Sequence, residues 1–154
     1  MTRAYVGLGA NIGDRQETIR RAVERLGVEP GIEVVGVSTL RETDPVGYPD
    51  QPRFVNGAVA VETWLSPREL LDRLLVVERE LGRVREASRR FGPRAIDLDL
   101  LLFGDSVVNE PDLTVPHPRL VERRFALEPL HELDRGLRLP DGRAVRDLLD
   151  SRLQ

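Results

Sequence analysis

Residues 96–103, with the sequence IDLDLLLF, form the stretch that decides the fold. In a β-strand the side chains point alternately to the two faces of the sheet. Ile96, Leu98 and Leu100 would therefore face a core, while Asp97 and Asp99 would project together from the other face. The stretch thus predicts a strand whose apolar side is packed and whose polar side is open to chemistry.

Further strands are predicted on both sides of this one, because β-branched or alternating apolar residues recur between Gly, Pro and Asn residues. They span residues 4–9, 32–40 and 54–62, and a short strand is expected at Val107-Val108. Residues 41–53 carry three prolines and predict a long, stiff loop. Long ordered loops often have a function, which makes this segment a candidate part of a site.

Two amphipathic helices separate these strands. The first follows Asp14, an N-cap candidate, and ends at Gly27. The second begins after Ser66, which forms a capping box with Glu69, and runs to Gly82. The order β-α-β-β-α-β predicts an α+β fold of the ferredoxin-like, split βαβ type. We expect a mainly antiparallel sheet with helices packed on one face, followed by one or two short C-terminal helices.

Composition indicates a cytoplasmic protein with a single domain over residues 1–154. The chain has a net charge of −3 and 40% hydrophobic residues. It has no Cys, which excludes a disulfide scaffold, a thiolate zinc site and a cysteine nucleophile. No apolar run approaches the ~20 residues of a membrane span. All 23 basic residues are Arg, which excludes Schiff-base chemistry and a phosphate-binding lysine loop. The mild acidity argues against a nucleic-acid partner, and we expect a monomer.

The pair Asp97 and Asp99 is a candidate metal site. Two neighbouring carboxylates repel each other, and a cation relieves that repulsion. Hard oxygen ligands suit Mg²⁺, which takes one or two carboxylates and completes its coordination with water and phosphate oxygens. The alternative is a solvent-facing strand on which paired acids deter aggregation.

An Arg-rich segment precedes the acidic pair. Within twelve residues it contains Arg83, Arg85, Arg89, Arg90 and Arg94. Guanidinium groups offer planar, bidentate donors to phosphate oxygens. Cations next to a candidate Mg²⁺ pair suggest a polyphosphate between them, although a solvated basic loop, or one that touches nucleic acid, remains the alternative.

Two other positions suggest ligand contacts. His117 lies between Pro116 and Pro118 in a stiff, extended stretch and can donate to a phosphate, whereas the other histidine, in a helical pattern, is expected to be structural. Phe54 and Asn56 share one face of their strand, and a ring with an amide suits a flat heterocycle. The alternative for Phe54 is a place in the core.

Taken together, five motifs closely resemble the 6-hydroxymethyl-7,8-dihydropterin pyrophosphokinase family, and the resemblance runs from Tyr5 to about Asp147. The block Gly-Pro-Arg-x-x-Asp-x-Asp is highly specific for that family. The motifs are Gly7-Leu8-Gly9-Ala10-Asn11, Asp50-Gln51-Pro52-x-Phe54-x-Asn56, Glu78-x-x-x-Gly82-Arg83-x-Arg85, Gly92-Pro93-Arg94-x-Ile96-Asp97-Leu98-Asp99 and Val115-Pro116-His117-Pro118.

The resemblance implies a ferredoxin-like fold and a magnesium-dependent diphosphotransferase of folate biosynthesis. Such an enzyme moves the pyrophosphoryl group of ATP to the hydroxymethyl group of the pterin and leaves AMP. The implied catalytic residues are Arg83, Arg94, Asp97 and Asp99, of which Asp97 and Asp99 hold two Mg²⁺ ions. The implied ATP-binding residues are Glu78, Arg85, Leu100, Thr114, His117 and Arg123. The implied pterin-binding residues are Thr43, Val46, Phe54, Asn56, Asp97 and Phe125.

Two other classes of function are compatible with the same pattern. A non-catalytic ferredoxin-like binding domain is one, but an RNA-binding version should show clustered aromatic residues on its sheet, and aromatic residues make up only 5% of the chain. A metal-dependent phosphohydrolase is the other. It differs in whether water or a pterin alcohol accepts the phosphates.

Overall fold

The structure is a computed structural model that describes residues 1–43, 53–82 and 96–152. Its main sheet has five strands, and a separate hairpin has two. The main strands are β1 (Thr2–Ala10), β2 (Ile32–Val37), β3 (Arg41–Thr43), β4 (Phe54–Thr63) and β5 (Asp97–Phe103), and the hairpin is β6 (Val108–Glu110) with β7 (Leu113–Val115). The helices are α1 (Arg15–Gly27), α2 (Pro67–Gly82), α3 (Arg124–Leu133) and α4 (Val145–Arg152), with a 3₁₀ turn at Leu120–Glu122.

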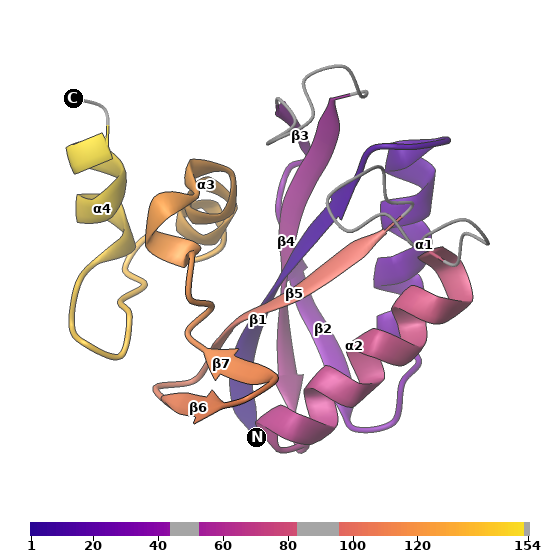
Figure 1. Cartoon of the computed structure of the whole chain (residues 1–154), viewed down its shortest axis with the longest axis horizontal. Coiled ribbons are helices and arrows are strands. Elements are labelled where there is room, and N and C mark those ends of the chain that lie inside the picture. The colour runs from indigo at the N-terminus through magenta and orange to yellow at the C-terminus, as the bar shows by residue number, and fades with distance from the viewer. Residues whose placement is uncertain (44–52, 83–95, 153–154) are drawn as a thin grey trace.

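The strand order β2-β4-β1-β5, with antiparallel pairing throughout, confirms the predicted ferredoxin-like fold. Each helix of the repeated β-α-β unit joins two parallel strands that are separated by a third strand. Thus α1 carries the chain from β1 past β4 to β2, and α2 carries it from β4 past β1 to β5 (Figure 1).

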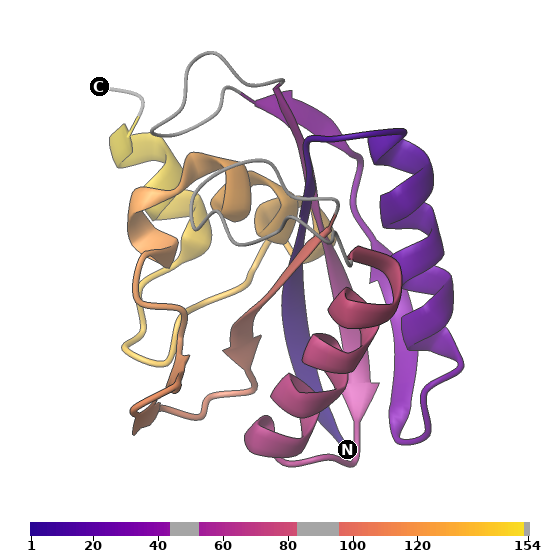
Figure 2. The same cartoon turned by 45° about the vertical axis from the view of Figure 1, so that its right-hand side comes forward.

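Helices cover both faces of the sheet (Figures 1 and 2). On one face α1 and α2 enclose a core that includes Val6, Leu98 and the helical Leu74. On the other face α3 and α4 pack over Tyr5 and Leu102 in a second core. The predicted C-terminal helices therefore exist, but they form a third layer, whereas the sequence pattern placed helices on one face only.

Both helix starts follow the predicted capping signals. The Asp14 carboxylate accepts the backbone N–H of Glu17 at 3.2 Å. In α2 the bonds are reciprocal: Glu69 N–H donates to Ser66 Oγ at 3.1 Å, and Ser66 N–H donates to the Glu69 carboxylate at 2.8 Å. These bonds satisfy N–H groups that lack helical partners. In the described part of the chain, no helix combines the length and apolarity that crossing a bilayer would require.

The predicted strand over residues 32–40 and loop over residues 41–53 were partly wrong. Regular pairing in β2 stops at Val37, and residues 41–43 form β3 on the same edge of β4. The chain stays beside β4 across this break because Ser38 exchanges bonds with Ala58: its N–H donates to the Ala58 carbonyl and its Oγ accepts the Ala58 N–H, both at 2.9 Å. The short strand expected at Val107-Val108 begins one residue later, and β7 was not predicted.

Candidate active site

The polar face of β5 continues across β1 onto β4. In the register of the sheet, Asp97 lies opposite Gly9, and Gly9 lies opposite Asn56. Asp99 lies opposite Gly7 one step further along. The side chains of Leu98 and Leu100 are at most 5% exposed and pack in the core on the α1–α2 side. The alternation expected from the sequence therefore holds, and Asp97, Asp99 and Asn56 belong to the face that α3 partly covers.

Gly9 forms the floor of this region. A Cβ atom at this position would lie 3.0 Å from Asn56 Oδ1 and 4.0 Å from both Asp97 Cβ and a ring carbon of Phe54. Residues from β4 and β5 thus surround one position on β1 that lacks a side chain. A glycine inside a strand often marks close approach of a ligand or another backbone. That signal was present in the Gly7-Leu8-Gly9 motif, but it gave no role to Gly9.

Asn56 is held by β3. Its side-chain amide donates a hydrogen bond to the hydroxyl of Thr43, and only 8% of Asn56 is exposed. Thr43 lies opposite Phe54 in the pairing of β3 with β4. The three residues predicted to bind the pterin on this side therefore form one contact group. Val46, the fourth, is outside the described residues.

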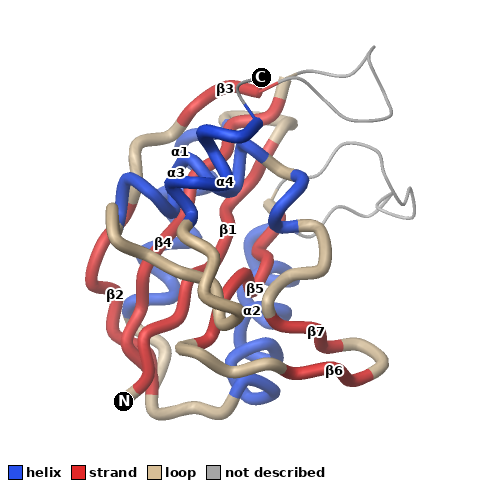
Figure 3. Tube along the Cα trace, turned by 90° about the vertical axis from the view of Figure 1, so that its left-hand side faces the viewer, coloured by secondary structure: helices blue, strands red, loops and turns tan. Residues whose placement is uncertain are grey.

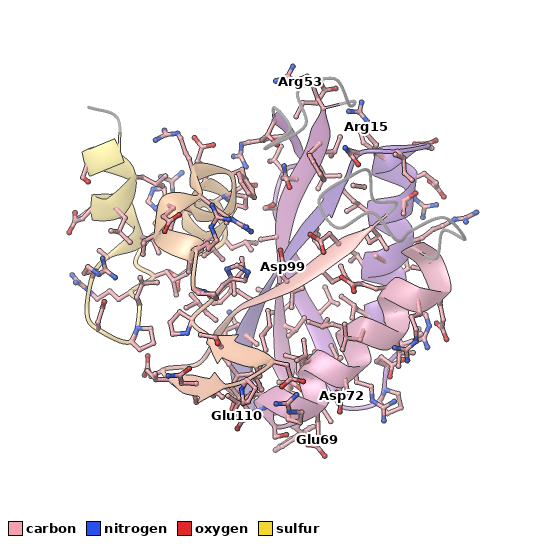
Figure 4. All side chains as sticks on the ribbon, viewed as in Figure 1. Arg15, Arg53, Glu69, Asp72, Asp99 and Glu110 are labelled. Atoms are coloured by element: carbon pink, nitrogen blue, oxygen red, sulfur yellow. The ribbon has the colours of Figure 1, made fainter. Side chains whose placement is uncertain are left out.

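The neighbours of this group are fixed from α1. Arg15 donates to the backbone carbonyl of Arg53 at 2.7 Å and to the carboxylate of Glu42 at 3.2 Å. Glu42 also pairs with the guanidinium of Arg53 at 3.4 Å. Arg15 and Arg53 lie at the end of the sheet where β1 ends and β4 begins, far from Glu69 and Glu110 at the opposite end (Figure 4). One Arg side chain thus ties together the residues next to Thr43 and Phe54.

Arg123 connects the acidic pair with the start of α3. Its Nη1 lies 4.0 Å from the carboxylate of Asp99. Its guanidinium carbon lies 5.5 Å from the centre of the Phe125 ring, within the range of a cation–π contact. The structure therefore brings Asp99, Arg123 and Phe125 together.

His117 lies near the same charges. Its backbone N–H donates to the Leu101 carbonyl at 3.0 Å, and its Nδ1 accepts the backbone N–H of Arg119 at 3.2 Å. An Nδ1 that accepts a hydrogen bond carries no proton, so the neutral ring has its proton on Nε2. Burial, and then the guanidinium groups of Arg123 and Arg119, lower the pKa of His117, against an opposing effect of Asp97. The ring is therefore a neutral donor through Nε2 at neutral pH.

Glu78 reaches β5 from the helix layer. Its carboxylate accepts the backbone N–H of Leu98 at 2.6 Å, on the strand edge that has no further neighbour in the described sheet. Leu98 separates Asp97 from Asp99, so this bond fixes the segment that carries both carboxylates. The observed contact gives Glu78 a role in orienting β5, and its predicted role in ATP binding stays a prediction.

Two further predicted ATP residues, Leu100 and Thr114, lie on the described strands β5 and β7. The side chain of Leu100 is in the core, so any contact with a nucleotide would involve its backbone. Thr114 is exposed on β7, where it pairs with Asn109. Arg83, Arg85 and Arg94 lie outside the described residues.

The carboxylate pair suits a magnesium ion by its chemistry. Asp97 and Asp99 offer hard oxygen atoms from the same face of one strand, and the side chain of Asp99 is 34% exposed. Among the described residues no group of three or more His, Cys, Asp or Glu side chains could hold a metal. Mg²⁺ is commonly held by one or two carboxylates together with substrate phosphates, so the residues present fit this ion.

An α+β domain of ferredoxin-like topology, with paired carboxylates beside an Arg and a His, is the arrangement expected of a phosphate-transferring enzyme. The model of the 7,8-dihydro-6-hydroxymethylpterin-pyrophosphokinase family matches residues 5–135. The chain belongs to this family, and the resemblance stated from its sequence motifs is confirmed.

Curated relatives agree over most of their length. The chain is 48% identical over 147 residues to the 2-amino-4-hydroxy-6-hydroxymethyldihydropteridine pyrophosphokinase of Pseudomonas aeruginosa, covering 96% of this chain and 90% of the relative. It is 50% identical over 130 residues to the enzyme of the same name from Bacillus subtilis, covering 84% and 77%.

Solved structures show the same fold. The Plasmodium falciparum HPPK-DHPS variant A437G matches with a TM-score of 0.75 at 15% identity, over 98% of this chain. The present chain spans 45% of that longer chain. At this identity the likeness speaks for the fold alone.

Proposed function

We propose that this chain transfers the pyrophosphoryl group of ATP to the hydroxymethyl group of 6-hydroxymethyl-7,8-dihydropterin, with Mg²⁺ held at Asp97 and Asp99. The reaction follows from membership of the family, whose name states it. The residue assignments rest on one observation: Asp97, Gly9 and Asn56 form a continuous row across three strands. This row supports the proposal, because it would put the metal-binding end next to the ring-binding end on one face.

The pterin site is proposed between two rings, Phe54 on β4 and Phe125 at the start of α3. Aromatic rings stack against a flat heterocycle, and an amide reads the donors and acceptors on its edge. Asn56 is suited to this reading because Thr43 accepts one of its amide hydrogens and so sets its orientation. Gly9 allows Asn56 to lie close over β1, because a Cβ atom there would come within 3.0 Å of Asn56 Oδ1. Val46 and Asp97 complete the proposed set.

The phosphate site is proposed around Arg123 and His117. Arg123 already lies beside Asp99, and its guanidinium can turn to phosphate oxygens. His117 can donate from Nε2 without adding charge. Around them we place the residues that the family resemblance implies, which are Arg83, Arg94, Arg85, Glu78, Leu100 and Thr114.

The transfer itself is a displacement at the β-phosphorus of ATP. The hydroxymethyl oxygen forms a new bond to that phosphorus, the bond to the oxygen shared with the α-phosphorus breaks, and AMP leaves. The alcohol loses its proton, for which we assign no side chain. Bound Mg²⁺ would neutralise phosphate charge that otherwise repels the alcohol. The chain's own contribution is alignment, because Phe54, Phe125 and Asn56 hold the alcohol while Arg123 and His117 orient the phosphates.

The decisive experiment is a coupled assay of AMP formation from ATP, with and without hydroxymethyldihydropterin. We expect AMP to form only when the pterin and Mg²⁺ are both present, and the pterin diphosphate to appear in equal amount. AMP formation that the pterin does not accelerate would contradict the proposal. Release of phosphate from ATP without the pterin would instead indicate a phosphohydrolase. We further propose that the protein is a cytoplasmic monomer and that its partners are small molecules only.

A further inference from the structure

Glu132, in the last turn of α3, joins this helix to the connection between β2 and β3. One carboxylate oxygen accepts both the backbone N–H and the hydroxyl of Thr39, each at 2.8 Å. The other oxygen accepts a hydrogen bond from Arg41 at 3.0 Å. Three bonds to one carboxylate from two neighbouring residues fix its position far better than a single surface ion pair does.

The elements joined by Glu132 carry the two rings of the proposed pterin site. Phe125 lies in the first turn of α3, and Glu132 lies seven residues later on the same helix. On the other side, Arg41 starts β3, which pairs with Phe54 and Asn56 of β4. The helix packs over β4 (Figure 3). The Glu132 contacts therefore connect α3, which carries Phe125, with β3 and its partner strand β4, which carries Phe54.

Arg41 adds an ion pair to this connection. It lies opposite Asn56 in the strand register, and its Nη1 is buried without a hydrogen-bond partner among the described residues. The carboxylate of Glu132 is thus the anionic group that the described structure places on this guanidinium. Burial opposes ionisation of Glu132, but the hydrogen bonds from Thr39 and Arg41 outweigh it and lower its pKa. The carboxylate stays charged at neutral pH, and the connection stays formed.

We propose that Glu132 is a positioning residue that sets the separation of the two rings and the orientation of Asn56, and thereby the affinity for the pterin. The proposal rests on the proposed pterin site. The bonds of Glu132 in the described structure go to Thr39 and Arg41, so it would act through α3 on Phe125 and through β3 on Thr43 and Asn56. The gap for a flat ring depends on distances of a few tenths of an ångström, because stacking and dispersion contacts weaken rapidly with separation.

The test compares Glu132→Ala and Thr39→Val with the matched control Glu128→Ala. Glu128 is also on α3, and its hydrogen bond, accepted from Arg124 at 3.1 Å, stays within that helix. Pterin binding is measured by calorimetry with Mg²⁺ and a non-hydrolysable ATP analogue present. Binding of the analogue alone, KM, kcat and Tm are measured on the same proteins.

We expect Glu132→Ala to weaken pterin binding and to raise the pterin KM about fivefold, the usual size of such coupling. The affinity for the ATP analogue and kcat should stay within about twofold, and Thr39→Val should show a smaller effect of the same kind. Glu128→Ala should leave the pterin affinity unchanged. If Glu132→Ala does not fold, Thr39→Val carries the test.

Unchanged pterin affinity in a variant that melts at lower temperature would overturn the proposal and leave Glu132 a purely structural contact. Equal losses for the pterin and the ATP analogue would also overturn it. Failure of the proposed function is seen separately, because the wild-type protein would then form no pterin diphosphate. In that case the inference fails with it, whatever the variants do.

Discussion

At the scale of single residues, Asp97 and Asp99 carry the clearest expectation. Replacing either with Asn removes one anionic oxygen from the polar face and nothing from the core on the other side of β5. We expect turnover to fall about 10²–10³-fold, as when a well-placed electrostatic group is lost. Steady-state kinetics in saturating Mg²⁺ measure this effect, and thermal unfolding should stay close to that of the wild type.

The matched control for these variants is Asp105→Asn in the exposed turn after β5. It changes the net charge equally and should keep full turnover. If Asp97→Asn or Asp99→Asn also kept full turnover, the metal assignment would be wrong.

Phe54→Ala and Asn56→Ala should weaken binding of the pterin far more than binding of ATP. Stacking contributes about 0.5–1.5 kcal/mol beyond area burial, and an unpaired buried polar group costs about 1–3 kcal/mol. Calorimetry with each ligand separates the two affinities. Asn109→Ala, in the exposed hairpin, is the control for the loss of an amide. Similar losses for both ligands would mean that this part of β4 supports only the fold.

His117 predicts a pH dependence of stability. Its pKa is lowered in the folded protein from the ordinary 6.5, so below that pH the unfolded chain binds more protons and stability falls. We expect the unfolding free energy of the wild type to drop as pH falls from about 6.5 towards the folded pKa. His117→Asn, which can still accept the Arg119 N–H, should lose less over the same window. Parallel curves for the two proteins, from denaturant titrations at several pH values, would refute this expectation.

Some of these residues were predictable from the sequence and others were not. Asp97 and Asp99 share a face in any strand, because strand periodicity is local. The position of Gly9 between Asn56 and Asp97 depends on the register of three strands, which no local pattern gives. Glu132 and Arg15 act across long sequence separations, and their surface positions give a sequence pattern no reason to single them out.

At the scale of elements, Gly31 fixes the turn into β2. Its φ of +88° lies in the left-handed region, and an added Cβ would lie 3.0 Å from Leu65 Cδ2. Gly31→Ala should lower the unfolding free energy by about 1–2 kcal/mol. Gly136→Ala is the control, because φ there is not positive and the nearest atom to an added Cβ would be Asp134 Oδ1 at an ordinary 3.7 Å. Denaturant unfolding of both variants tests this, and equal stabilities would contradict the strain argument.

The predicted elements were confirmed where the local signals were strong: apolar periodicity together with capping in α1 and α2, and alternation in β5. They failed between Val37 and Thr43. There the Ser38 hydroxyl replaces a strand carbonyl as acceptor for Ala58, and β3 then pairs with the start of β4. Such pairing is decided by the partner strand, so the proline-rich composition nearby suggested a loop that starts too early.

At the scale of the whole molecule, the layer formed by α3 and α4 should be as important for stability as the opposite one. Leu130 on α3 and Leu74 on α2 are both 0% exposed, in the cores on opposite faces of the sheet. Each truncation to Ala should cost about 2–5 kcal/mol in a single cooperative transition. Leu148→Ala, at a partly buried position in α4, should cost less. A loss below about 1 kcal/mol for Leu130→Ala in denaturant unfolding would mean that α3 is only loosely attached.

The overall topology was predictable because the order of strands and helices leaves few arrangements for a split βαβ fold. The covering of the second face was not predictable in the same way. The sequence of a short helix with mixed composition reveals its apolar side, but it does not reveal the surface against which that side packs. The contact of Leu127 and Leu130 with Ala58 and Ala60 is a property of the assembled sheet.

The alternation along β5 also bears on how such an enzyme can change over generations. Substitutions at Leu98 and Leu100 would mainly reduce the amount of folded protein in a cell, whereas we expect substitutions at Asp97 and Asp99 to leave that amount nearly unchanged and to lower the activity. The two kinds of defect are therefore separated by a single peptide unit. Mutations in these two sets of positions can therefore change the amount of folded protein and its activity separately, although both sets lie within the seven residues of β5.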